Sequence, residues 1–122
     1  MSPPESYKLL SVNTAPDRAR RMIQKIVEDV KNEYTIIHCA NAASIEEVES
    51  LASLHQPDIL FCASMWTPEQ STEIKRIARK VVHGLRCYAV PQGMQVRDGP
   101  EATVEHVKSQ LPNIIEGDLG LQ

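Results

Sequence analysis

The sequence predicts a single three-layer α/β domain, and two observations lead to this. Short apolar stretches alternate with longer segments in which apolar residues recur at helical spacing. Such alternation is typical of parallel strands, because two parallel neighbours need a long crossover connection between them. The chain has 122 residues, 42% of them apolar, which suits one hydrophobic core. We therefore expect residues 1–122 to form one domain, with 1–6 disordered and 117–122 a tail.

Four segments of the chain have the composition of strands. The third is an almost unbroken apolar run, of the kind that a parallel sheet buries on both faces. A possible short fifth edge strand is Asn113-Ile114-Ile115-Glu116, although the residues that follow are too few to form a helix that covers it. The four main segments are 7–13, 34–39, 57–64 and 85–90.

Four helices are expected around these strands. The clearest start is Thr67-Pro68-Glu69-Gln70, which combines a capping threonine, a proline at the first helical position and a glutamine at the third. A similar pattern at Ser44 and Glu47 predicts a second capping box. Gly84 suits the left-handed residue that ends a helix. The helices are expected over 15–32, from 44 onward, over 67–83 and over 100–111.

Right-handed crossovers place helices on both faces of the sheet and predict the flavodoxin-like strand order 2-1-3-4. In this architecture ligands bind beyond the carboxyl ends of the strands. Neutral polar side chains and the single tryptophan of the chain follow the strands at this edge. The candidate ligand-binding residues are Asn13, Thr14, Asn41, Ser64, Trp66 and Gln92.

Several kinds of chemistry are disfavoured at this edge. A phosphate cradle needs glycines that let backbone N–H groups approach the anion, and the turn Asn13-Thr14-Ala15-Pro16 has none. The usual dinucleotide, flavin-phosphate and nucleoside-triphosphate sites are therefore not expected, and neither is any cofactor. The cysteines, Cys39, Cys62 and Cys87, lack metal-ligand spacing, so we expect no metal site and three unpaired, buried thiols.

Charge and hydropathy narrow the range of partners. The net charge is -3 and the isoelectric point about 5.8, which gives no general attraction to nucleic acid or to anionic lipid. The longest apolar run is shorter than a bilayer span needs, and residues 1–5 carry no signal pattern. We expect a cytoplasmic protein that binds neither nucleic acid nor membranes.

Two segments of the chain resemble the response-regulator receiver domain. The stretch Val12-Asn13-Thr14-Ala15-Pro16-Asp17 is similar to the Val-Asp-Asp-Glu-Pro turn of receivers. Residues 57–65, Pro-Asp-Ile-Leu-Phe-Cys-Ala-Ser-Met, resemble the Pro-Asp-Leu-x-x-x-Asp-x-Met strand, and Ala40-Asn41-Ala42 matches the turn after the second strand. The likeness covers about residues 9–79.

The resemblance implies a receiver without its switch chemistry. The two metal-binding acids of the family fall on Asn13 and Thr14, and the phosphoacceptor aspartate falls on Ala63. Magnesium-assisted aspartyl phosphorylation needs carboxylates at these positions. The resemblance thus implies a pseudo-receiver that lacks the phosphoacceptor.

Two features outside these motifs have alternative interpretations. Trp66 either packs under the loop 91–94 or faces a ligand or partner. Arg18, Arg21 and Lys25 form a basic stripe near the start of their helix, where cations oppose the helix dipole. The stripe is either a solvated face, which is the simpler interpretation, or a docking surface for an acidic partner.

Two functional hypotheses follow. The favoured one is a catalytically silent, receiver-like binding or dimerisation module. The alternative is a small-molecule-binding protein or enzyme that uses a polar pocket beside Trp66, although no acid, base or nucleophile is evident there. For the first hypothesis we expect a homodimer, because the apolar pair Ile114 and Ile115 has no covering helix and needs a partner surface.

Overall fold

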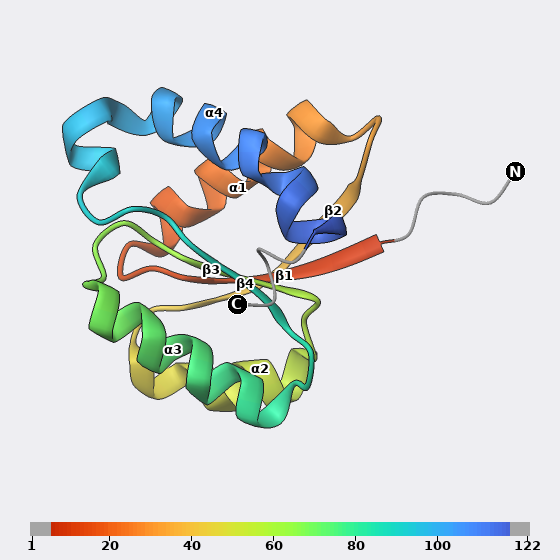
Figure 1. Cartoon of the computed structure of the whole chain (residues 1–122), viewed down its shortest axis with the longest axis vertical. Coiled ribbons are helices and arrows are strands. Elements are labelled where there is room, and N and C mark those ends of the chain that lie inside the picture. The colour runs from red at the N-terminus through yellow and green to blue at the C-terminus, as the bar shows by residue number, and fades with distance from the viewer. Residues whose placement is uncertain (1–5, 118–122) are drawn as a thin grey trace, which may run out of the picture.

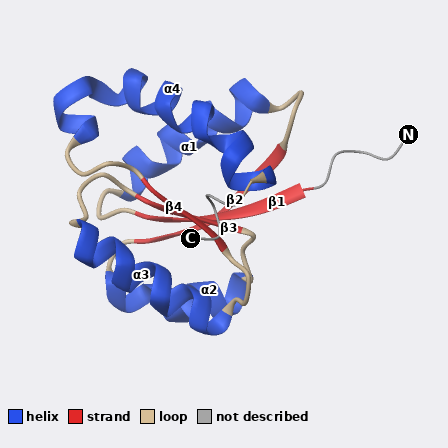
Figure 2. Cartoon of the chain, in the orientation of Figure 1, coloured by secondary structure: helices blue, strands red, loops and turns tan. Residues whose placement is uncertain are grey.

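A computed structural model, which describes residues 6–117, consists of a four-stranded parallel sheet with helices on both faces (Figures 1 and 2). The strand order is β2-β1-β3-β4, so the predicted flavodoxin-like arrangement is confirmed. Residues 1–5 and 118–122, on which most of the predicted disordered start and tail fall, lie outside the described residues. The strands are β1 (Ser6–Val12), β2 (Thr35–Ala42), β3 (Ile59–Cys62) and β4 (Arg86–Ala89).

The helices divide into two pairs, one on each face of the sheet. Figure 1 shows α1 and α4 side by side above the sheet and α2 and α3 below it. A short 3-10 turn precedes α2. The helical elements are α1 (Pro16–Val30), η1 (Ile45–Glu47), α2 (Val48–His55), α3 (Pro68–Val81) and α4 (Met94–Glu116).

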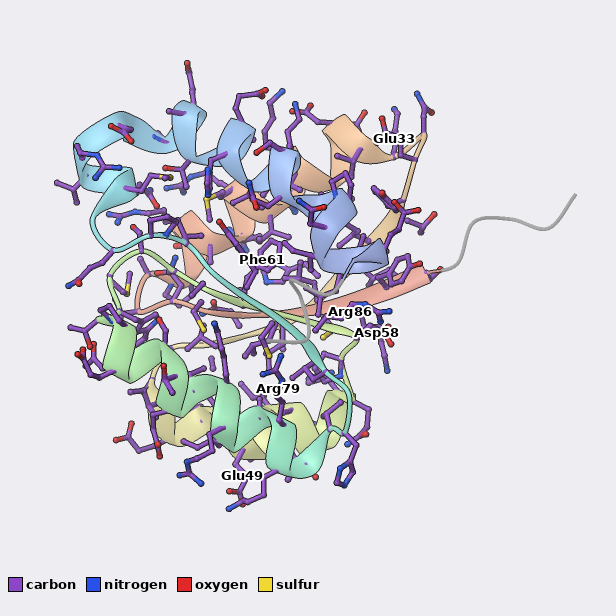
Figure 3. All side chains as sticks on the ribbon, in the orientation of Figure 1. Glu33, Glu49, Asp58, Phe61, Arg79 and Arg86 are labelled. Carbon is purple, nitrogen blue, oxygen red and sulfur yellow. The ribbon has the colours of Figure 1, made fainter. Side chains whose placement is uncertain are left out.

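Each face of the sheet has its own hydrophobic core. Alternate side chains of a strand point to opposite faces, so Leu10 packs with α2 and α3 while its neighbour Leu9 packs with α1 and α4. Phe61 lies on the α1 and α4 side, as Figure 3 also shows. The sheet is therefore covered on both sides, which explains why the β3 sequence is apolar at every position.

The two predicted capping boxes have different outcomes. Thr67 accepts a hydrogen bond from the Gln70 backbone N–H at 3.1 Å and the Gln70 side chain returns to the Thr67 N–H at 2.9 Å, which confirms the box. The Ser44 side chain makes no capping bond. Glu47 instead accepts from the Ala43 N–H at 2.8 Å, one residue earlier, and the chain makes η1 before α2 begins.

The last helix is longer than predicted and has a kink. Helix α4 contains Gly99 with φ 90° and ψ 166°, a conformation that separates the turn 94–98 from the main helix after it. At its other end α4 continues through Pro112 to Glu116. The fifth edge strand is therefore wrong, because residues 113–116 are helical.

The proposed contact residues of the homodimer lie inside the molecule. Ile114 and Ile115 are 0% and 4% exposed, packed in the core on the α1 and α4 side of the sheet. The premise that this pair needs a second chain to cover it is wrong, because the helical turn directs both side chains onto the sheet. These two residues therefore give no support to the prediction of a dimer.

Two other expectations concern the described residues. The three cysteines are free thiols, and Cys62 and Cys87 are buried, as predicted, whereas Cys39 is only partly buried. Burial raises the pKa of Cys62 to about 12 and that of Cys87 to about 11, so neither thiolate forms readily near neutral pH. In the part of the chain between residues 6 and 117, no helix has both the length and the apolar character needed to cross a membrane.

Candidate functional site

The polar residues at the carboxyl edge of the sheet bond mainly to their own backbone. Asn13 is buried, and its Oδ1 accepts a hydrogen bond from the Ala15 N–H at 2.7 Å, which shapes the turn into α1. The Asn41 Nδ2 donates to the Asn13 carbonyl at 3.0 Å. The structure thus brings these two predicted site residues together, but as parts of the turn and not as walls of a pocket.

A short hydrogen-bond chain extends from Asn41 under the edge of the sheet. Asn41 Oδ1 lies 2.7 Å from Ser11 Oγ, and Ser11 Oγ lies 2.8 Å from His38 Nε2. The bond from Asn41 Nδ2 to the Asn13 carbonyl fixes the orientation of the Asn41 amide, so its Oδ1 faces Ser11. An amide oxygen only accepts, and the Ser11 hydroxyl therefore donates its hydrogen to it. Ser11 Oγ can therefore offer only a lone pair to His38 Nε2.

This direction argues against Ser11 as a nucleophile. A catalytic base must accept the hydroxyl proton, whereas the Ser11 hydroxyl donates it to Asn41 Oδ1. Burial lowers the pKa of His38 below its ordinary value, and a hydrogen bond with the Ala40 backbone opposes the effect. The group therefore joins β1 to β2 as a satisfied polar network.

Two of the remaining candidates support the loops that follow β1, β3 and β4. Ser64 is buried; its carbonyl accepts from the Gly93 N–H at 2.9 Å and its hydroxyl from the Gln95 N–H at 3.4 Å. Thr14 is exposed, and its hydroxyl contacts the Met65 sulfur at 3.0 Å. Neither contact leaves a polar group directed at a common ligand.

Trp66 is part of the core of the domain. Its indole Nε1 donates to the Val12 carbonyl at 2.8 Å, and the side chain is 9% exposed. A buried indole needs one partner for its N–H, and β1 provides it. The ring is therefore packed mainly in the core on the α2 and α3 side of the sheet, and one margin lines a hollow that Pro91 and Gln92 also line.

That hollow, the Trp66 hollow, is a cavity of about 260 Å³ between the start of α3 and the loop after β4. It contains Trp66 and Gln92 but none of the other predicted ligand residues. Lys75 brings a cation and Ser71 a hydroxyl to it. Its lining is Trp66, Pro68, Ser71, Thr72, Lys75, Ala89, Val90, Pro91 and Gln92.

The larger concave feature lies on the helical face. Between α1 and α4 runs a groove of about 720 Å³, referred to below as the α1/α4 groove. Its floor contains Met22 and Val104. The remaining lining residues are Arg18, Arg21 and Lys25 from α1 and Gln95, Pro100, Glu101 and Glu105 from α4.

The two walls of the groove carry opposite charges. The α1 wall is basic and the α4 wall acidic, and a chain of ion pairs that includes Lys25 and Glu105 joins the two helices. In that chain Lys108 bonds Asp29 at 3.1 Å and Glu105 at 2.9 Å, and Asp29 also pairs with Lys25 at 3.1 Å. Among residues 6–117, no acid lies within ion-pair distance of Arg18 or Arg21.

The sequence indicated one wall of this groove and not the other. The basic stripe of α1 was visible from residue spacing, but its placement opposite α4 was not. The acidic wall was missed because Glu101 and Glu105 oppose α1 only through the packing of α4 beside it, and a local pattern does not show which helices become neighbours. Glu101 and Glu105, four residues apart on the last predicted helix, were the available signal.

The opposite edge of the sheet holds a small charged cluster. Asp58, Arg79 and Arg86 lie near each other where β3 and β4 begin (Figure 3). Asp58 accepts from the Lys8 N–H at 2.9 Å, and Arg79 donates to the Leu85 carbonyl at 3.0 Å. These contacts join loops, and the cluster lies away from both hollows.

The structure contains no acidic or metal-ligating group at the positions singled out by the receiver resemblance. Ala63 is buried, and its N–H bonds the Val12 carbonyl at 3.1 Å. Within residues 6–117, no group of three or more His, Cys, Asp or Glu side chains is placed to hold a metal ion. No protein-family model matches the sequence, and no curated protein matches it significantly.

Proposed function

We propose that this chain is a catalytically silent binding or dimerisation module on a receiver-like scaffold, and that its binding surface is the α1/α4 groove. The observation that carries the proposal is the pair of guanidinium groups, Arg18 and Arg21, that line the groove without an ion-pair partner among the described residues. Such groups are available to another molecule, whereas the polar groups at the sheet edge are bonded internally.

The absence of catalytic geometry in the described residues supports the same proposal. Among them, Ser11 is the only serine or threonine whose hydroxyl meets a histidine ring, and it donates its hydrogen to Asn41. A nucleophile, a base and an oxyanion donor around one open site would be expected of an enzyme. The edge of the sheet offers amides and hydroxyls already used in turns.

A second candidate function is small-molecule binding in the Trp66 hollow. The favouring observation is that Lys75, Ser71 and Gln92 bring a cation, a hydroxyl and an amide to one hollow beside an aromatic ring. About 260 Å³ is slightly below the usual range of ligand pockets, about 300–1,000 Å³, whereas the α1/α4 groove lies within it.

Trp66 fluorescence distinguishes the two candidates, because its indole borders the Trp66 hollow and not the α1/α4 groove. The native protein is titrated with a panel of anionic and neutral metabolites, and separately with magnesium and beryllofluoride. For a silent module we expect no saturable change in emission in either experiment. Ala63 offers no carboxylate to the phosphate analogue.

A saturable change in Trp66 emission that Lys75→Ala or Gln92→Ala abolishes would show that a small molecule binds in the Trp66 hollow. This result would contradict our proposal. Lys25→Ala, on the α1/α4 groove, is the matched control and should leave such a change intact. A magnesium-dependent change with beryllofluoride would contradict the silent, pseudo-receiver part of the proposal.

A further inference from the structure

We propose that the α1/α4 groove is the contact surface of a two-fold homodimer, in which α1 of each copy lies over α4 of the other. This inference rests on the proposed function and names its partner as a second copy of this chain. It replaces Ile114 and Ile115, which are buried, with a surface that is open and charged.

The charge pattern of the walls selects the partner. An occupant of the groove meets Arg18, Arg21 and Lys25 on one side and Glu101 and Glu105 on the other. A uniformly acidic helix would be repelled by the α4 wall, and a basic one by the α1 wall. A complementary occupant needs an acidic row and a basic row separated by apolar side chains, and the same face of a second copy has this pattern.

The axial register of the two helices fits a two-fold axis along the groove. Helices α1 and α4 both return across the same face of a parallel sheet, so both run from left to right in Figure 1, although they are inclined to each other. A two-fold rotation about an axis along their mean direction exchanges α1 with α4 and leaves the position of each residue along that axis unchanged. The contact between Asp29 and Lys108 defines which residues of the two helices share a level.

Counting back from that contact aligns opposite charges. Arg21 is eight residues before Asp29, and Glu101 is seven before Lys108, so the two lie at similar distances from that contact, about 12 Å and about 10.5 Å along their helices. Lys25 and Glu105 follow four residues later on each helix, a rise of about 6 Å in both cases. Each copy thus places Arg21 at Glu101 of the other copy, and Lys25 at its Glu105.

The basic wall is unfavourable within a single chain. Arg18 and Arg21 lie in the first two turns of α1, where the helix dipole disfavours cations. Arg20, on the same helix, has a local partner in Asp17 at 3.3 Å. Carboxylates from a second copy would give Arg21 the ion-pair partner that it lacks among the described residues of its own chain.

Apolar surface lies between the charged rows. Met22 and Val104 form the floor, and Val96, 91% exposed, directly follows Gln95 at one end of the groove. Burial of Met22 and Val96 favours association, whereas Val104, 6% exposed, is already covered within the chain; the rows of charge fix the orientation. The apolar area is small, so we expect a reversible dimer that is sensitive to salt.

Sedimentation equilibrium of the wild-type chain at about 100 μM, well above a Kd of about 1 μM, should give the mass of a dimer. Arg21→Glu and Glu101→Arg each create two like-charge contacts across the axis and should weaken the dimer about tenfold or more. Arg20→Glu changes charge equally but lies outside the groove lining, and should leave the dimer unchanged. Circular dichroism establishes that each variant is folded.

Mixing the two weakened variants tests the two-fold geometry itself. In the mixed pair, the glutamate introduced at position 21 of one chain meets the arginine introduced at position 101 of the other. The second contact is between the native Arg21 and the native Glu101. The mixture should therefore form a dimer about as tight as the wild type, as should the double variant Arg21→Glu with Glu101→Arg. No change in the fold of one variant can produce this recovery in a mixture.

A monomeric wild type at about 100 μM, the concentration set by the expected Kd, would overturn the inference, as would a dimer that both groove variants leave intact. Failure of the mixture to associate, with both variants folded, would also overturn it. These results leave the fluorescence test of the Trp66 hollow unaffected. If the wild type is a monomer and Trp66 fluorescence shows no ligand binding, a second copy is excluded as the partner. The proposal of a silent binding module then still stands.

Discussion

At the scale of single residues, the side chains at the carboxyl edge of the sheet hold the turns together. Asn13 closes the turn into α1, and Asn41 ties β2 to that turn. Trp66 anchors the loop after β3 to the end of β1 through its indole N–H. Each of these side chains forms a hydrogen bond inside the chain and so fixes the shape of the turns at this edge.

The anchoring role of Trp66 gives a prediction for stability. Trp66→Phe removes the hydrogen bond to the Val12 carbonyl and leaves space beside the smaller ring. The two effects together should lower the free energy of unfolding by about 1–3 kcal/mol, measured by urea denaturation. Leu54→Ala, at a position 75% exposed, is the control and should change it by less than about 0.5 kcal/mol. An unchanged stability would mean that the indole bond contributes nothing.

His38 should make stability depend on pH. Burial lowers its pKa in the folded state, so below the unfolded-state pKa of about 6.5 the unfolded chain binds a proton more readily. Stability is therefore lost as the pH falls through this value. Compared with His38→Gln, which keeps a polar partner for Ser11 and does not titrate, the wild type should lose more stability between about pH 7.5 and pH 5. Parallel pH profiles of the two proteins would contradict a depressed pKa.

At the scale of secondary-structure elements, α4 departs furthest from local rules. A proline in a helix interior costs about 3 kcal/mol, yet α4 continues past Pro112 for another turn. That turn buries Ile114 and Ile115, each worth roughly 1.5–3 kcal/mol, which offsets the lost backbone bond. The element thus ends where its buried face ends.

The kink at Gly99 is the second departure, and it can be tested by substitution. Its φ of 90° with ψ of 166° belongs to a region that only glycine enters at low cost. A Cβ there would meet no atom within 4 Å, so the cost of Gly99→Asn is backbone strain alone. We expect about 1–3 kcal/mol of destabilisation in thermal or urea unfolding.

Gly93 provides the matched control for the kink. It has φ 80° and ψ -1°, a left-handed conformation that asparagine tolerates. Gly93→Asn should therefore cost clearly less than Gly99→Asn. Equal costs at the two glycines would contradict the assignment of the kink to Gly99.

At the scale of the whole molecule, two cores on opposite faces of one sheet make the fold cooperative. Strand residues alternate between the two cores, so every strand contributes to both. Loss of one core would expose one face of all four strands to water. The helical pair α1 and α4 covers one face and carries the charged groove on its outer side. Scaffold and proposed binding surface are thus separate sides of the same helices.

Ile115→Asp tests the burial of the last turn of α4. If this residue were on a dimer surface, the variant would be a folded monomer with full helical content. Because Ile115 is 4% exposed in the core, the variant instead buries an unpaired carboxylate, which should cost more than about 4 kcal/mol. Helical circular dichroism should fall sharply. Asn113→Asp, at an exposed position nearby, should leave the spectrum unchanged.

The sequence by itself determined the class of fold, the strand order and the clearest helix start. Alternating strands and helices leave few right-handed parallel topologies, and the capping box at Thr67 is satisfied within four consecutive residues. Only the tertiary structure decided that candidate residues at the sheet edge bond to one another and that α4 continues beyond Pro112. It also decided that a basic and an acidic wall face each other across the α1/α4 groove. The physical reason is that a local pattern constrains the dihedral angles and faces of adjacent residues, whereas the partner of a side chain lies on a segment far away in the chain.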